Sequence, residues 1–247
     1  MTYRKSLELV LIAVNAALYA GVGYLTYLGV FAPVVGTVRF WPSVVIPAVF
    51  AVVYSPRVGA FGAGIGIFIS DMLIHGDPVL SITVGVTSNM AGFYVLGVLA
   101  KTLGRAGRGP SLSIAMQAIP LAVTLLALWM NFFGDALTGS VFLGAAILSF
   151  GISVFYSLYR PVYAGLVAAS SIGLLLGATM IGLGVWGYSQ FFSLPAVASG
   201  GKNLPLFAAA IWFLWTYLTE IPFLMVLLPP LTAAVKKAVP VAAREQS

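Results

Sequence analysis

Residues 39–71 read RFWPSVVIPAVFAVVYSPRVGAFGAGIGIFISD, and this stretch decides the fold. It holds two short apolar segments, 40–54 and 58–69, which are separated only by a Ser-Pro-Arg turn. Two prolines in the first segment remove backbone hydrogen-bond donors. Four glycines in the second segment lack side chains, so neighbouring backbones can approach closely. The stretch therefore predicts a tight helical hairpin, with Arg39 and Asp71 at the same membrane face.

Composition places this hairpin in a membrane. Of the 247 residues, 61% are hydrophobic and only 7% are charged, whereas a soluble domain carries about 25% charged residues. Cysteine is absent, which excludes disulfides and thiolate chemistry. The composition predicts an all-α polytopic membrane helical bundle, and the chain shows no boundary that would divide residues 1–247 into more than one domain.

Apolar runs bounded by charged residues or by Gly/Pro/Ser clusters predict about eight transmembrane helices. They fall at 7–30, 40–54, 58–74, 80–103, 112–133, 137–158, 162–187 and 204–234. A hydrocarbon core about 30 Å thick needs about 20 residues of helix, so the second and third runs are short for a full span. The first run follows two basic residues but has no cleavage pattern, and we interpret it as a retained span.

Basic residues predict the orientation. With the N-terminus in the cytoplasm, ten of the twelve lysines and arginines fall at cytoplasmic ends, and only Arg39 and Lys202 fall outside. The acidic residues Asp71, Asp77 and Asp135 then all fall outside. We therefore expect a plasma-membrane protein with both termini in the cytoplasm.

Signatures of catalysis are missing from the sequence. The run SGGKN at 199–203 lacks the first glycine and the Ser/Thr of a phosphate-binding loop. With one histidine, His75, the chain has no HExxH zinc motif. We expect no enzyme activity, no metal site and no cofactor.

Polar and aromatic side chains gather at the helix ends that are predicted to lie outside. Aromatic faces with a few donors and acceptors are what a flat organic ligand with polar edges needs. The same residues are also explained by an interfacial aromatic belt and by solvated loop ends. The predicted substrate-binding residues are Arg39, Trp41, Asp71, His75, Asp77, Tyr188, Trp212 and Trp215.

Glu220 is the one ionisable residue well inside a predicted span. It lies about 16 residues from the predicted outer start of its helix, roughly 24 Å deep, and so nearer the cytoplasm. A charge at a helix centre costs about 2.5–3.5 kcal/mol, so this residue is expected to face the interior, to be protonated or to be paired. The position favours a structural or partner-contact role over a ligand role.

The first helix carries a flat stripe of small residues. Small side chains four residues apart allow close helix approach, and the stripe consists of Ala13, Ala16, Ala17 and Ala20, followed by Gly21. Its neighbour is either a helix of the same bundle or another subunit. Similar pairs at 62/66 and 173/177 predict internal packing.

Several of these motifs together resemble the substrate-binding S component of an energy-coupling factor (ECF) transporter. They are R-F-W-P-x5-P-A with Y-S-P-R-x-G, then G-x-G-I-x4-S-D-M-L, the alanine stripe, and the closing E-I-P-F-L-M-V-L-L-P-P-L-T-x3-K-K. The resemblance covers about 7–104 and 160–237. It implies a six-helix core, into which residues 112–158 insert an extra helical hairpin.

The resemblance also implies a function. Such subunits capture a water-soluble vitamin or related micronutrient from outside, and their alanine motif docks on a transmembrane coupling subunit driven by two ABC-type ATPases. An alternative is a self-sufficient proton-coupled secondary transporter, in which Glu220, with Asp71, carries the proton. A third class, an intramembrane enzyme acting on lipid, has only the group at Asp71, His75 and Asp77 as a candidate site.

Overall fold

The computed structural model is an all-α bundle, described for residues 3–27, 41–103, 109–134, 136–195 and 201–238. All eight predicted helices are present, and seven of them are long and apolar enough to cross a membrane. The prediction of an all-α polytopic membrane bundle is confirmed. The helices are α1 (Tyr3–Tyr27), η1 (Pro42–Val44) continuing as α2 (Val45–Val53), α3 (Pro56–Ile74), α4 (Pro78–Leu80) continuing through η2 (Ser81–Val86) into α5 (Thr87–Leu103), α6 (Gly109–Trp129), α7 (Ala136–Tyr159), α8 (Pro161–Phe191) and α9 (Phe207–Ala238).

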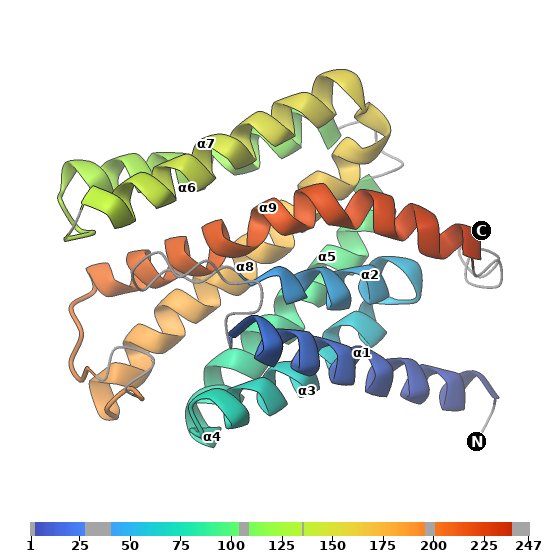
Figure 1. Ribbon diagram of the computed structural model, residues 1–247, viewed down its shortest axis with the longest axis horizontal. Coiled ribbons are helices and arrows are strands. Elements are labelled where there is room, and N and C mark those ends of the chain that lie inside the picture. The colour runs from blue at the N-terminus through green and yellow to red at the C-terminus, as the bar shows by residue number, and fades with distance from the viewer. Residues whose placement is uncertain (1–2, 28–40, 104–108, 135, 196–200, 239–247) are drawn as a thin grey trace.

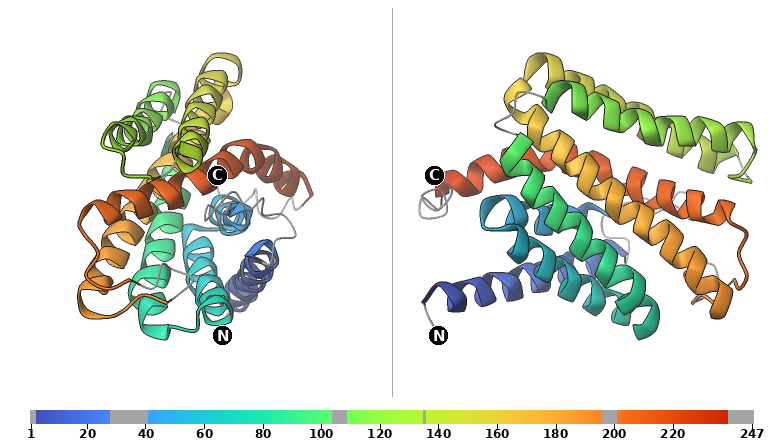
Figure 2. Two further views of the ribbon diagram at one scale, coloured as in Figure 1. Left: turned by 60° about the vertical axis from the view of Figure 1, so that its left-hand side comes forward. Right: turned by 180° about the vertical axis from the view of Figure 1, so that it is seen from behind.

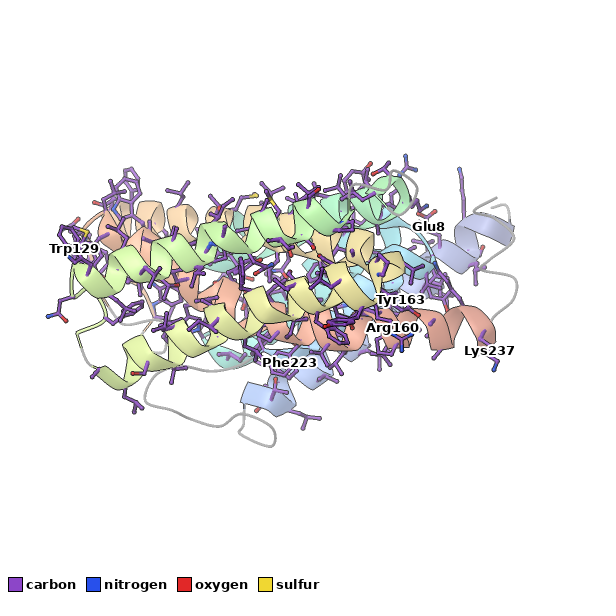
Figure 3. The ribbon with its side chains drawn as sticks, turned by 90° about the horizontal axis from the view of Figure 1, so that it is seen from above. Glu8, Trp129, Arg160, Tyr163, Phe223 and Lys237 are labelled. Atoms are coloured by element: carbon purple, nitrogen blue, oxygen red, sulfur yellow. The ribbon has the colours of Figure 1, made fainter. Side chains whose placement is uncertain are left out.

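The two ends of the bundle differ in what they carry. The start of α1 and the end of α9 lie at one end, which we call the terminal end, and α4 lies at the other, which we call the α4 end (Figures 1 and 2). Arg160 and Lys237 lie at the terminal end, whereas Trp129 lies at the opposite one (Figure 3). The described basic residues therefore concentrate away from α4, as the charge pattern predicted.

The hairpin predicted from residues 39–71 is formed by α2 and α3. Ser55 caps α3, because its hydroxyl oxygen accepts a hydrogen bond of 3.1 Å from the amide of Val58, and Pro56 takes the first helical position. A Cβ atom at Gly59 would lie 2.7 Å from the Cα atom of Ala51. Only glycine allows the two helices to come so close.

The glycine face of α3 receives α1. The side-chain amide of Asn15 donates hydrogen bonds to the carbonyl oxygens of Val58, at 3.0 Å, and Gly59, at 3.3 Å. This amide fills the space beside Gly62, where an added Cβ would overlap it. At Gly66 an added Cβ would lie 2.9 Å from a carbonyl oxygen of α1. The predicted internal packing of the 62/66 pair is confirmed.

The second glycine pair joins α8 to α5. A Cβ atom at Gly173 would lie 2.6 Å from the carbonyl oxygen of Gly92, and one at Gly177 would lie 3.8 Å from the Cα atom of Gly92. Both glycines therefore pack internally, as predicted. This close contact sets the distance between α5 and α8, which both line the cavity described below.

The extra hairpin predicted at 112–158 is formed by α6 and α7, which lie side by side over α8 and α9 (Figures 1 and 3). Gln117 holds the hairpin to the bundle. Its amide nitrogen donates hydrogen bonds of 2.7 Å to the hydroxyl oxygens of Ser171 and Tyr217, and all three residues are buried. The hairpin thus packs as an outer layer on one side of the bundle.

Candidate functional site

A cavity of about 250 Å³ lies in the half of the bundle near the α4 end. It is lined by α3, η2, α5, α8, α9, one residue each of α1 and α4, and the segment that precedes η1. Five of the eight predicted substrate-binding residues line it: Trp41, Asp71, His75, Trp212 and Trp215. Aliphatic side chains complete much of the wall, among them Ile67, Ile74, Leu80, Val84, Ile181 and Val185.

The cavity exists because α2 begins deep in the bundle. The amide of Trp41 donates a hydrogen bond of 3.2 Å to the carbonyl oxygen of Thr219. Thr219 lies twelve residues after Phe207, where α9 begins, so it lies about 18 Å along that helix. On its other side, the Trp41 ring packs against α1, 2.8 Å from where a Cβ of Gly23 would lie. Trp41 therefore lies between α9 and α1 and forms part of the cavity wall.

The Trp212 and Trp215 rings supply the aromatic wall. They stack at 5.8 Å between centroids with planes 26° apart. Both come from the first turns of α9, and both line the cavity. Their place in the cavity wall fits the ligand-binding interpretation of these two tryptophans better than an interfacial aromatic belt.

Asp71 is held in a fixed position by two partners. The Ser81 hydroxyl donates a hydrogen bond of 2.6 Å to one carboxylate oxygen, and Nε2 of His75 lies 3.5 Å from the other. Nδ1 of His75 accepts a hydrogen bond of 3.1 Å from the amide of Asp77, so the neutral ring carries its proton on Nε2, facing Asp71. A Cβ at Gly85 would lie 2.6 Å from the Asp71 carboxylate, so glycine leaves the space that this group occupies.

Asp77 and Tyr188 do not line the cavity, although the sequence predicted both as binding residues. The Tyr188 hydroxyl donates a hydrogen bond of 2.7 Å to Asp77, whose other oxygen accepts from the amides of Val79 and Leu80 at 3.0 Å. Burial acts to raise the pKa of Asp77, but the hydrogen bonds from Leu80, Tyr188 and Val79 outweigh it and leave this pKa below its usual value. The pair ties α4 to α8. The predicted binding residue Arg39 lies outside the described residues.

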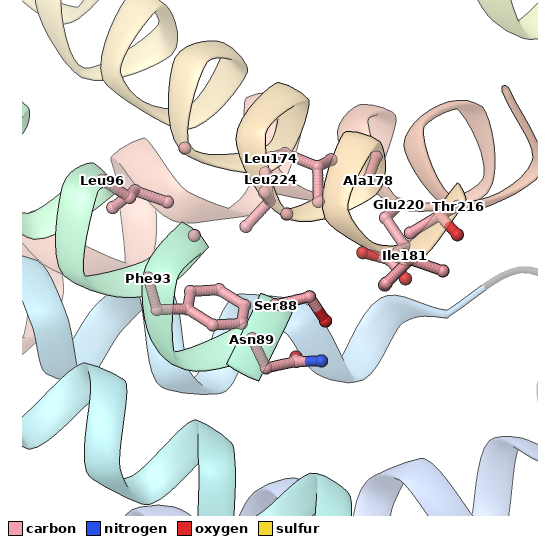
Figure 4. Close-up of a pocket in the computed structure, with 13 residues that line it drawn as sticks. Ser88, Asn89, Phe93, Leu96, Leu174, Ala178, Ile181, Thr216, Glu220 and Leu224 are labelled. Atoms are coloured by element: carbon pink, nitrogen blue, oxygen red, sulfur yellow. The ribbon is translucent and has the colours of Figure 1, made fainter. Parts of the chain in front are cut away.

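Glu220 lines the cavity, contrary to the expectation from sequence. It also lines a narrower cleft of about 30 Å³ between α5, α8 and α9, where it lies beside Thr216 and Ile181 (Figure 4). Glu220 lies thirteen residues after Phe207, about 20 Å along α9 and so less deep than the sequence estimate, and the cavity extends inward to Glu220 and its neighbour Thr219. No described residue donates a hydrogen bond to its carboxyl group or forms an ion pair with it.

Two further polar residues of the site were missed by sequence reasoning. The Tyr19 hydroxyl donates a hydrogen bond of 2.9 Å to Asn89, whose amide donates to the carbonyl oxygen of Gly85 at 2.9 Å. Both side chains line the cavity, and Tyr19 is only 2% exposed. The available signal was a polar side chain in the middle of an apolar helix, which marks interior sites in membrane proteins.

The alanine stripe of α1 is divided by the fold. Ala16 and Ala20 are buried against α3, where the Ser70 hydroxyl donates a hydrogen bond of 3.2 Å to the Ala20 carbonyl oxygen. Ala13 and Ala17, along the edge of the same stripe, are exposed. Of the four predicted docking residues, only these two are accessible to another subunit.

Comparison with protein-family models finds no match to this chain, and comparisons with curated proteins and with solved structures find none either.

Proposed function

We propose that this protein is the substrate-binding membrane subunit of an ECF-type importer, which captures a small water-soluble solute in the cavity near the α4 end. The observation that carries the proposal is the convergence of Trp41, Asp71, His75, Trp212 and Trp215 on one cavity. These residues come from three regions far apart in the chain. A largely apolar pocket with a few convergent polar groups is the usual form of a small-molecule site.

The size and walls of the cavity suit a ring-bearing solute such as a vitamin or related micronutrient. A cavity of about 150 Å³ accommodates benzene, and this one is about 250 Å³. The stacked pair of Trp212 and Trp215 offers flat aromatic surface, while Asp71 and Asn89 offer polar atoms for the edge of a ring. We propose that the site captures this solute without converting it chemically.

The orientation follows from charge. Arg160 and Lys237 lie at the terminal end (Figure 3), where α1 also begins with Lys5 in its first turn. Cytoplasmic ends of membrane proteins are enriched in such residues. The proposal therefore puts both termini in the cytoplasm and opens the cavity toward the outside of the plasma membrane. Delivery inward falls to a transmembrane coupling subunit and two ABC-type ATPases, with Ala13 and Ala17 on the exposed side of α1 as the docking contact.

A proton-coupled secondary transporter is the second candidate. It is favoured by one observation: the carboxyl groups of Asp71 and Glu220 line the same cavity. A transporter of this class needs a titratable group at the solute site, so that proton and solute binding are linked.

The two candidates predict different behaviour of the purified chain. Native mass spectrometry of the detergent-purified protein identifies the bound solute, and that solute is then radiolabelled. An S component binds it in liposomes but does not accumulate it without ATPase subunits. Accumulation by the chain alone, abolished by an uncoupler, would establish the secondary transporter instead.

A further inference from the structure

The cavity near the α4 end carries acidic groups and aromatic faces, and the basic side chain among its described lining residues is His75, which contacts Asp71. Its seventeen described lining residues include two carboxyl groups, Asp71 and Glu220, three tryptophans, and neither lysine nor arginine. A cavity with low-dielectric walls and groups of one sign concentrates its field on the space between them. The described wall therefore favours a positively charged occupant.

The two carboxyl groups differ in what they contact. Asp71 already has a hydrogen bond from Ser81 and a contact with His75. Glu220 has neither a hydrogen bond nor an ion pair from the described residues. An acidic group deep in a span is unfavourable unless it is paired or neutralised. A bound solute with a positively charged group can form the ion pair that Glu220 does not form with the described residues.

Helix geometry connects this carboxyl group to the aromatic wall. Trp212, Thr216 and Glu220 are spaced four residues apart on α9, so their side chains lie on one face of the helix, and all three line the cavity. The face extends about 12 Å from the tryptophan to the carboxyl group. It presents an aromatic surface at the outer side, a hydroxyl group in the middle and an acidic group at the inner side.

We propose that the captured solute is an organic cation, an aromatic or heteroaromatic ring that carries a positively charged nitrogen. The ring lies against Trp212 and Trp215, and the charged nitrogen pairs with Glu220. A cation within about 6 Å of a tryptophan ring is also attracted by the negative face of that ring. An anionic solute would offer Glu220 no positively charged partner. This inference rests on the proposed capture function, since it assigns the class of solute to the same cavity.

Three bicyclic probes of similar shape and different charge test the inference on the purified full-length protein. They are N-methylquinolinium, a cation; quinoline, which is neutral at mildly alkaline pH; and quinaldate, an anion. Dissociation constants are measured at millimolar probe concentrations by saturation-transfer NMR in detergent, and empty micelles provide the background. We expect N-methylquinolinium to bind about tenfold more tightly than quinoline, and quinaldate to bind most weakly.

Glu220→Gln removes the charge and keeps the side-chain shape. It should weaken N-methylquinolinium binding about tenfold and leave quinoline binding unchanged. Glu8→Gln, which removes a carboxyl group from α1 outside the cavity, is the matched control and should change neither. The affinities of the three probes for the unmodified protein are measured without any variant. Their order therefore still tests the inference if Glu220→Gln misfolds.

The outcomes separate this inference from the proposed function. Equal binding of the cation and quinoline, tighter binding of quinaldate, or a cation preference that survives Glu220→Gln overturns the cationic class and leaves solute capture standing. Identification of a neutral or anionic co-purified solute by native mass spectrometry does the same. Absence of binding by all three probes overturns both the class and this cavity as the capture site.

Discussion

The amide of Trp41 lies 3.2 Å from the carbonyl oxygen of Thr219 and donates a hydrogen bond to it, about 18 Å inside the bundle as measured along α9. This contact fixes where the short helix α2 begins. Since α2 occupies only the half of the bundle near the terminal end, the neighbouring helices surround open space in the other half. The cavity is therefore a consequence of a short helix and one backbone contact.

Trp41 is expected to contribute directly to binding, because it lines the cavity. Trp41→Ala should weaken binding of the co-purified solute by about tenfold to a hundredfold, as measured by isothermal titration calorimetry in detergent. Trp129→Ala is the control, because Trp129 is 83% exposed at the end of α6. Equal effects of the two changes would place the solute elsewhere.

Close packing of α1 on α3 should be sensitive to one added methyl group. Gly62→Ala places a Cβ where the Asn15 amide lies, so it should destabilise the protein by about 1–3 kcal/mol, measured by thermal unfolding in detergent. Gly144→Ala in α7 meets no atom within 4 Å and should be neutral or slightly stabilising. If Gly62→Ala unfolds at the parental temperature, α1 does not pack as described.

The divided alanine stripe predicts opposite results for neighbouring alanines. Ala17→Trp places a large ring on the exposed side of α1, so solute affinity should stay within about threefold while co-purification with a coupling complex and cellular uptake are lost. Ala16→Trp forces the ring against α3 and should destabilise the fold itself. Loss of solute binding in Ala17→Trp would show that the exposed side also belongs to the core.

The contact between Tyr188 and Asp77 should make stability depend on acid. The pKa of Asp77 is lowered in the fold, so its stabilising effect is complete above the ordinary aspartate pKa of about 3.9 and is lost as pH falls through the lowered value. Tyr188→Phe removes one of the hydrogen bonds that lower this pKa, and should reduce the loss of stability on acidification.

Unfolding temperatures measured across the acid range test this expectation. Asp77→Asn is the matched control, because asparagine keeps the helix cap but does not titrate. A parental profile identical to that of Asp77→Asn would show that the aspartate makes no pH-dependent contribution.

Labelling of single cysteines should establish the orientation, since the chain has no native cysteine. Trp129 and Tyr159 are 83% and 71% exposed and lie at opposite ends of the hairpin formed by α6 and α7. We expect a membrane-impermeant thiol reagent added outside cells to label Trp129→Cys and to spare Tyr159→Cys. The reverse pattern would invert the topology and place the cavity on the cytoplasmic side.

Most helices were predictable because local patterns determine them. The Ser-Pro-Arg turn at 55–57 and the glycine face of α3 specified a hairpin, and the structure has it with a capped start at Ser55. The glycine pairs were predictable as packing sites, since small residues four apart leave a groove for a neighbouring helix.

The depth of the site was not predictable from the same patterns. Periodicity identifies the helix that follows Trp41 but gives no measure of where it lies relative to α9, so Trp41 was expected at the outer surface. For the same reason, because sequence periodicity does not show how deep the cavity reaches, Glu220 was expected to lie outside the site. Asp77 and Tyr188 were correctly expected at the same end, but their contact spans 111 positions in the chain and has no local signal.

The deep position of Trp41 also has an electrical consequence. With the α4 end facing outward, as proposed, and with solvent in the cavity, the barrier between the two aqueous phases is the part of the bundle that lies inward of Thr219, about 18 Å along α9. The membrane voltage then falls mainly across that thin remainder, and crossing the full voltage is worth about 2.3 kcal/mol per charge at 100 mV. Glu220 lines the cavity beside this remainder, so in the proposed function a resting potential that is negative inside would draw the proposed cationic solute toward it.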